Sequence, residues 1–115
     1  KPFNPIAREN ARSGLTAGLD AMKYIDVRWH HSHEDEPIRL VSEIGADGFE
    51  VRKLEFFRDG RVGFASKESN GDATQLGIAA VPDLSEINSG QEFSGISIDA
   101  TAFEELWKRH AAKSI

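Results

Sequence analysis

Apolar and polar residues alternate through most of the stretch from residue 22 to residue 66, and this period of two most constrains the fold. Successive side chains of a β-strand point to opposite faces, so the alternation predicts strands with one buried face. Ala46-Asp47-Gly48 and Asp59-Gly60 are turn signals, and an Asp-Gly pair between apolar residues is typical of a hairpin. The four expected strands cover residues 22–29, 38–44, 49–57 and 61–66, with a bulge near Arg52-Lys53 where the alternation changes phase. The sequence therefore predicts an antiparallel meander.

The C-terminal part of the chain shows helical signals instead. Thr101 and Glu104 have the spacing of a capping box, which begins a helix. Residues at the i, i+3, i+4, i+7 spacing of one helix face follow, namely Phe103, Leu106, Trp107 and His110. Before this helix, we expect a short edge strand within residues 74–81 and a short helix over residues 84–88 that ends before Gly90. The expected fold class is α+β, an antiparallel sheet of four to five strands with the C-terminal helix packed on one face.

Residues 1–21 differ from the rest of the chain. They contain Gly14 and Gly18 and few large apolar side chains, so we expect a weak helix or tail outside a single domain at 22–115. The absence of cysteine from the 115 residues excludes disulfides and thiolate chemistry. No apolar stretch reaches the roughly 20 residues of a membrane span. We therefore expect a cytoplasmic protein with no membrane partner.

The net charge of −5 is distributed unevenly. Residues 1–67 carry equal numbers of basic and acidic residues, whereas residues 68–105 carry eight acidic residues and no lysine or arginine. An acidic surface repels phosphate, which argues against nucleic-acid binding, and it favours a basic protein partner because complementary potentials steer association. The candidate binding residues are acidic side chains in loops or in the short helix: Glu34, Asp35, Glu36, Asp72, Asp83, Glu86 and Glu92.

A cluster of imidazole and carboxylate side chains is the candidate for metal chemistry. It comprises His30, His31, His33, Glu34, Asp35 and Glu36. These residue types bind zinc or nickel. A zinc site also needs ligands held by rigid elements, whereas this cluster falls in a polar loop. We therefore favour a solvated loop that binds nickel adventitiously, and we expect no physiological metal and no cofactor.

No catalytic motif stands out in the sequence. The glycines do not form a phosphate-binding loop, and no serine lies in a nucleophile elbow. Trp29 and Trp107 are expected to be core residues, and His110 is expected to be a half-buried packing residue of the helix stripe. Arg52 and Lys53 are expected to pair across strands with acids such as Glu43 or Glu50. By elimination, we expect a binding or inhibitory module rather than an enzyme.

Several short motifs are spread over residues 22–110. They are Met22-Lys23-Tyr24, Trp29-x-His31, Asp35-Glu36-Pro37, Glu43, Glu50-Val51-Arg52-Lys53-x-Glu55, Asp59-Gly60-Arg61, Pro82-x-Leu84-x-Glu86-Ile87-Asn88, Glu92-Phe93, Ile96-Ser97 and Phe103-Glu104-x-x-Trp107. Together they resemble a small bacterial domain family of uncharacterised function. Proteins of this kind look like the immunity proteins of polymorphic toxin and contact-dependent growth inhibition systems. The resemblance implies a small acidic protein that neutralises a toxic nuclease domain.

Three functions are therefore compatible with the sequence. The first is an immunity protein, a monomer or weak dimer, that binds and neutralises a cognate basic toxin domain through its acidic surface. The second is a small metal-dependent hydrolase that uses the loop from His30 to Glu36. The third is an oligomerising structural module with an apolar patch on the exposed sheet face, where Tyr24, Val41 and Phe57 would lie.

Overall fold

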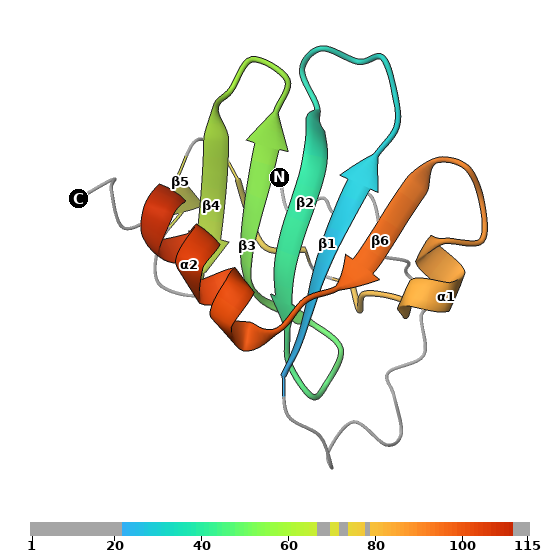
Figure 1. Ribbon diagram of the computed structural model, residues 1–115, viewed down its shortest axis with the longest axis vertical. Helices are drawn as coiled ribbons and strands as arrows, with labels where there is room; N and C mark the ends of the chain where they lie inside the picture. The colour runs from blue at the N-terminus through green and yellow to red at the C-terminus, as the bar shows by residue number, and fades with distance from the viewer. Residues whose placement is uncertain (1–21, 67–69, 72–73, 78, 112–115) are drawn as a thin grey trace.

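The computed structural model describes residues 22–66, 70–71, 74–77 and 79–111. Its elements are β1 (Lys23–Trp29), β2 (Pro37–Ile44), β3 (Glu50–Phe57), β4 (Val62–Ser66), β5 (Asn70–Gly71), α1 (Leu84–Ile87), β6 (Phe93–Ser97) and α2 (Ala100–His110). The strands form one antiparallel sheet in the order β5-β4-β3-β2-β1-β6 (Figure 1). β1 to β5 follow one another as a meander, and β6 returns to pair with β1. The predicted α+β class is confirmed.

α2 lies across one face of the sheet (Figure 1). Phe103 is fully buried there against Val41 and Leu54, and Trp107 packs around this cluster. The ring of His110 meets the ring of Phe56 edge-on, with centroids 5.1 Å apart. The predicted apolar stripe of the last helix is therefore confirmed, and His110 packs against the sheet.

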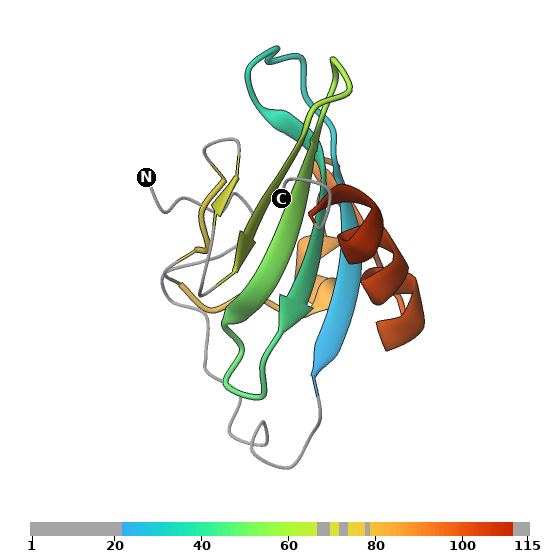
Figure 2. The same cartoon turned by 90° about the vertical axis from the view of Figure 1, so that its left-hand side faces the viewer.

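The opposite face of the sheet carries a second apolar cluster. Ile25, Val27 and Ile44 pack there against Ile87 of α1. Residues 74–77, which come after β5, lie on this side of the sheet, away from α2 (Figure 2). The sequence predicted only one covered face, whereas the sheet is covered on both.

The turns and the bulge follow the sequence closely. Gly48 and Gly60 have φ angles of 88° and 98°, a backbone region that glycine adopts without the clash of a Cβ. Glu43 faces Arg52 across β2 and β3, yet the next residue of β2 faces Glu50. Val51 is the extra residue of this bulge, and it lies one position before the predicted site.

Two strands differ from the sequence prediction. The described parts of 74–81 contain no strand, and the short edge strand is Asn70–Gly71 instead. β6 was not predicted. Its sequence, Phe-Ser-Gly-Ile-Ser, is dominated by small residues with low β-propensity, so the alternation of apolar residues is weak.

The beginning of α2 also differs from the prediction. Asp99 is the N-cap, and its Oδ1 accepts a hydrogen bond of 2.8 Å from the backbone N–H of Ala102. Thr101 lies inside the first turn rather than capping it. The carboxylate of Glu104 is directed to Arg52 on β3 instead. An aspartate two residues before Thr101 caps equally well and allows two more residues to join the helix.

The expectation of an exposed apolar patch on the sheet was wrong. Val41 is completely buried beneath α2, and the ring of Tyr24 lies 5.4 Å from the ring of Phe103. Phe57 is half-buried, with the guanidinium carbon of Arg61 4.4 Å from its ring centre. α2 therefore covers the part of the sheet face, at Val41 and Tyr24, through which an oligomerising module would contact its partner.

Candidate protein-binding surface

His31 holds the acidic loop between β1 and β2, residues 30–36, in place. The Nδ1 of His31 accepts a 2.9 Å hydrogen bond from the backbone N–H of His33, and its Nε2 lies 2.8 Å from the carbonyl of Pro37. Arg58, from the turn between β3 and β4, donates to the carbonyl of His31. These contacts leave the side chains of Glu34 and Asp35 exposed.

The same contacts bear on the metal hypothesis. Both ring nitrogens of His31 are used in hydrogen bonds, and Nε2 of His30 lies 2.8 Å from the hydroxyl of Ser94. A metal would have to break one of these bonds to gain the imidazole of His31. The described residues contain no group of three or more side chains placed to hold a metal ion. The geometry thus gives the metal-dependent hydrolase no support.

Two further candidate carboxylates already have structural partners. Asp83 is the N-cap of α1, and its Oδ1 accepts from the N–H of Glu86 and from the hydroxyl of Ser85. Glu92 accepts a 3.0 Å hydrogen bond from the indole N–H of Trp29. The expected short helix over residues 84–88 already places Asp83 at its start, where an aspartate is a common cap. The contact of Glu92 with Trp29 was missed.

The structure brings some of the predicted residues together. The backbone N–H of His30, where the acidic loop begins, donates to the carbonyl of Glu92. Glu92 therefore lies at the base of the loop that carries Glu34 and Asp35. Asp83 and Glu86 lie farther along, on α1 beside β6 (Figure 1). Asp72 lies outside the described residues.

Most basic side chains of the sheet are neutralised within the fold. Arg39 pairs with Asp26 at 2.7 Å, and Arg52 pairs with both Glu43 and Glu104. By contrast, several exposed or half-exposed carboxylates form no ion pair among the described residues. They are Glu34, Asp35, Glu36, Asp83 and Glu92.

Arg52 joins the sheet to α2. Its guanidinium carbon lies 4.8 Å from the ring centre of Phe103 and 5.1 Å from that of Trp107. Hydrogen bonds to Glu43 raise the pKa of Arg52, and its bonds to Glu104 lower the pKa of that carboxyl. The predicted pairing of Arg52 with Glu43 is confirmed, and the link to Glu104 was missed.

Lys53 lies on the other face and is completely buried. Its Nζ lies 3.3 Å from Glu55 and 3.5 Å from Glu50. Both acids belong to β3 itself, so Lys53 pairs within its own strand and not across strands as expected. Burial is the main cause that raises the pKa of Glu50, and the charge of Lys53 opposes it. Such a buried cluster is a feature of the fold rather than of the exposed surface.

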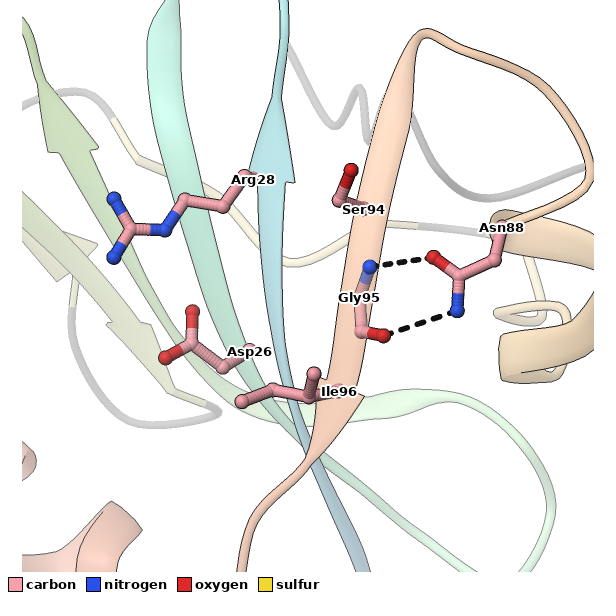
Figure 3. A pocket seen from close by; sticks show the side chains of 6 residues that line it. All are labelled: Asp26, Arg28, Asn88, Ser94, Gly95 and Ile96. Carbon is pink, nitrogen blue, oxygen red and sulfur yellow. Dashed lines mark hydrogen bonds between the residues drawn. The ribbon is translucent and has the colours of Figure 1, made fainter.

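A pocket of about 440 Å³ lies over β6, on the face that also carries α2 (Figure 3). Its lining residues are Asp26, Arg28, Asn88, Ser94, Gly95 and Ile96. The side chain of Ile96 is 61% exposed, which makes it the most exposed large apolar residue described. Arg28 is exposed and forms no ion pair among the residues described.

The carboxamide of Asn88 reaches the outer edge of β6 (Figure 3). Its Nδ2 donates to the carbonyl of Gly95 at 3.0 Å, and its Oδ1 accepts from the N–H of Gly95 at 2.6 Å. An asparagine side chain thus forms the pair of bonds that a neighbouring strand would form. No signal in the sequence indicated this contact, because β6 itself was not predicted.

These features define a small α+β domain built on an open antiparallel sheet, with acidic side chains gathered on the β1–β6 side. A family model with the description Domain of unknown function (DUF6881) matches residues 23–112, and the chain belongs to this family. No curated protein and no solved structure matches the chain. Within the described residues, no helix has the length and apolar character that crossing a membrane requires.

Proposed function

We propose that this domain is an immunity protein that binds and neutralises a cognate bacterial toxin domain, a basic nuclease, in the cytoplasm. The observation that carries the proposal is the segregation of charge. Three cations of the sheet, Arg39, Arg52 and Lys53, pair with acids inside the fold. Glu34 and Asp35 remain exposed and form no ion pair among the described residues, close to Glu92.

The physical basis of binding is electrostatic complementarity. Exposed carboxylates attract a basic surface and raise the rate of encounter. The active groove of a nuclease binds phosphates with cationic side chains, and carboxylates can occupy the same positions. Charge pairs that become desolvated at the centre of the interface contribute far more than those at its rim. The motifs resemble those of a small domain family of uncharacterised function, and small acidic proteins of this kind look like immunity proteins, which is in keeping with the same function.

The direct test is co-expression with the C-terminal domain encoded by the gene immediately upstream. The two proteins should elute as one stoichiometric complex from a sizing column. The purified toxin domain should cleave nucleic acid alone and lose this activity when the immunity protein is added. If the two proteins elute separately and cleavage is unaffected, the proposal is wrong.

Charge reversal locates the surface. The double variant Glu34→Lys/Asp35→Lys should weaken binding by roughly tenfold or more, because it replaces attraction by repulsion. Glu105→Lys is the matched control, since Glu105 is an exposed carboxylate on α2. Asp83 is unsuitable for this test because it caps α1, so its substitution would also disturb the helix.

A further inference from the structure

β6 is an outer strand of the sheet. One of its edges pairs with β1, and β6 stands at the end of the strand order. It has five residues, whereas β5 at the opposite end has two. Outer strands present backbone N–H and C=O groups that can pair with a further strand. β6 is therefore the longer of the two edges at which this sheet can grow.

The direction of the backbone groups in β6 follows from its hydrogen bonds. The carbonyl of Glu92 and the N–H of Ile98 point toward β1, where they bond to His30 and Tyr24. Successive residues of a strand alternate in direction. Phe93, Gly95 and Ser97 therefore direct their N–H and C=O groups away from β1. Gly95 shows this directly, because both of its groups bond to Asn88.

Among the described residues, the side chain of Asn88 bonds to the middle of this edge, at Gly95. A side chain that donates one bond and accepts one can be exchanged for the backbone of an incoming strand without loss of either bond. The groups of Phe93 and Ser97 lie on either side of it and extend the edge in both directions.

The pocket lies where a side chain of an added strand would reach. Ser94, Gly95 and Ile96 line it from β6, and Asn88 lines it from the outer side. Alternate residues of an added strand would point onto this face, where exposed Ile96 offers an apolar contact. Arg28 on β1 favours a side chain that accepts hydrogen bonds.

The charges around β6 select the occupant. Glu92 precedes the strand, Asp99 follows it, and Asp83 lies on the adjacent helix α1. All three carboxylates are exposed. A second copy of this chain would bring like charges together, whereas a basic segment would meet opposite charge at both ends of the strand.

We infer that the edge of β6 is a strand-addition site, and that its occupant is an extended basic segment of the toxin domain. The incoming backbone displaces the carboxamide of Asn88 from Gly95 and pairs with Phe93 and Ser97. Main-chain hydrogen bonds then supply affinity, and the pocket over β6 supplies specificity. This inference rests on the proposed function and names the binding mode of the same partner.

A proline substitution tests the edge directly. Ser97→Pro removes an outward N–H and leaves the bonds to β1 in place, since proline is tolerated at outward positions of edge strands. Ser97→Ala is the matched control, because it removes the same hydroxyl and keeps the N–H. In titrations with the toxin domain, we expect Ser97→Pro to weaken binding roughly tenfold or more and Ser97→Ala to change it less than about twofold.

Amide hydrogen exchange on the wild-type protein gives a second test, which does not depend on whether a variant folds. The amides of Phe93 and Ser97 should exchange at least about tenfold more slowly in the complex than in the free protein. Unchanged exchange, or wild-type affinity of a folded Ser97→Pro variant, overturns strand addition.

The two proposals fail in different ways. A complex that is weakened by Glu34→Lys/Asp35→Lys but not by Ser97→Pro overturns strand addition and leaves the immunity function standing. The absence of any complex with the wild-type protein overturns both.

Discussion

The Nζ of Lys53 lies 3.3 Å from Oε2 of Glu55, in a part of the sheet from which solvent is excluded. Glu50 approaches the same ammonium from 3.5 Å, so one cation faces two carboxylates. The segment at 74–77 closes over them: the hydroxyl of Thr74 donates to Glu55, and the N–H of Gly77 donates to Glu50. The ammonium of Lys53 is therefore the positive charge that compensates both buried carboxylates on this face of the sheet.

Replacement of this lysine should be among the most damaging single changes. Lys53→Met leaves two buried carboxylates without their cation, and we expect the free energy of unfolding to fall by about 3–5 kcal/mol. Urea titration followed by circular dichroism measures it. Lys23→Met, at an exposed position of β1, is the control and should stay within roughly 0.5 kcal/mol of wild type. Equal effects of the two substitutions would contradict the buried-cluster interpretation.

The pH dependence of stability should report the pKa of Glu50. This pKa is raised in the folded protein, chiefly by burial. A raised carboxyl pKa means that the folded state holds its proton more tightly than the unfolded chain. The resulting stabilisation is complete below the ordinary carboxyl pKa of about 4.3 and is lost as the pH rises through the folded value.

Glu50→Gln separates this contribution from the other titrating groups. The amide stays neutral, so the variant lacks the proton-linked loss. Urea titrations from about pH 3 to about pH 7 should show that wild type loses stability relative to the variant as the pH rises. A difference that is constant over this range would show that Glu50 titrates normally.

A methyl group at Gly95 should disturb the contact between β6 and α1. A Cβ there would lie 2.9 Å from Cδ2 of Leu84 and 3.1 Å from Cγ2 of Val27. We expect Gly95→Ala to cost about 1–3 kcal/mol, because the buried Val27 has little room to move. Gly90→Ala is the control, since nothing lies within 4 Å of a Cβ at that position. Thermal unfolding of both variants measures the difference. Equal melting temperatures would contradict the close approach of Leu84 and Val27 to Gly95.

The charge of Arg52 alone should not be sufficient for its role. Its guanidinium bonds to Glu43 and Glu104 and stacks over Phe103. A lysine ammonium cannot form this planar set of contacts. Arg52→Lys should therefore cost about 1–3 kcal/mol in urea titrations, whereas Arg109→Lys, at an exposed position of α2, should be nearly neutral. A neutral Arg52→Lys would show that charge suffices.

The meander and the last helix could be predicted because their signals are local. The alternation in β1 to β4 and the turns with Gly48 and Gly60 lie within a few residues of the contacts that they specify. β6 could not be predicted, because Gly95 is present for the close approach of α1 rather than for strand propensity. The second covered face of the sheet was missed as well, because α1 packs there close to β6, which was not predicted.

The candidate site was predictable by residue type but not by role. Glu34 and Asp35 are exposed as expected. The partners of Glu92 and Asn88 could not be inferred, because Trp29 is 63 residues from Glu92 and Gly95 belongs to the missed strand. The partners of Glu55 and Glu50 likewise could not be inferred, because Thr74 and Gly77 come from a segment without regular structure.

The return of β6 to β1 has a consequence for the folding kinetics. The hairpins of the meander close loops of a few residues, whereas pairing Trp29 with Phe93 closes a loop of about sixty residues, with a larger loss of chain entropy. This order favours a transition state in which the meander is formed and β6 is still unpaired. Substitutions in the turn at Gly60 should then slow refolding, while substitutions in β6 should mainly speed unfolding. Folding itself would thus end with the addition of a strand to an existing sheet edge.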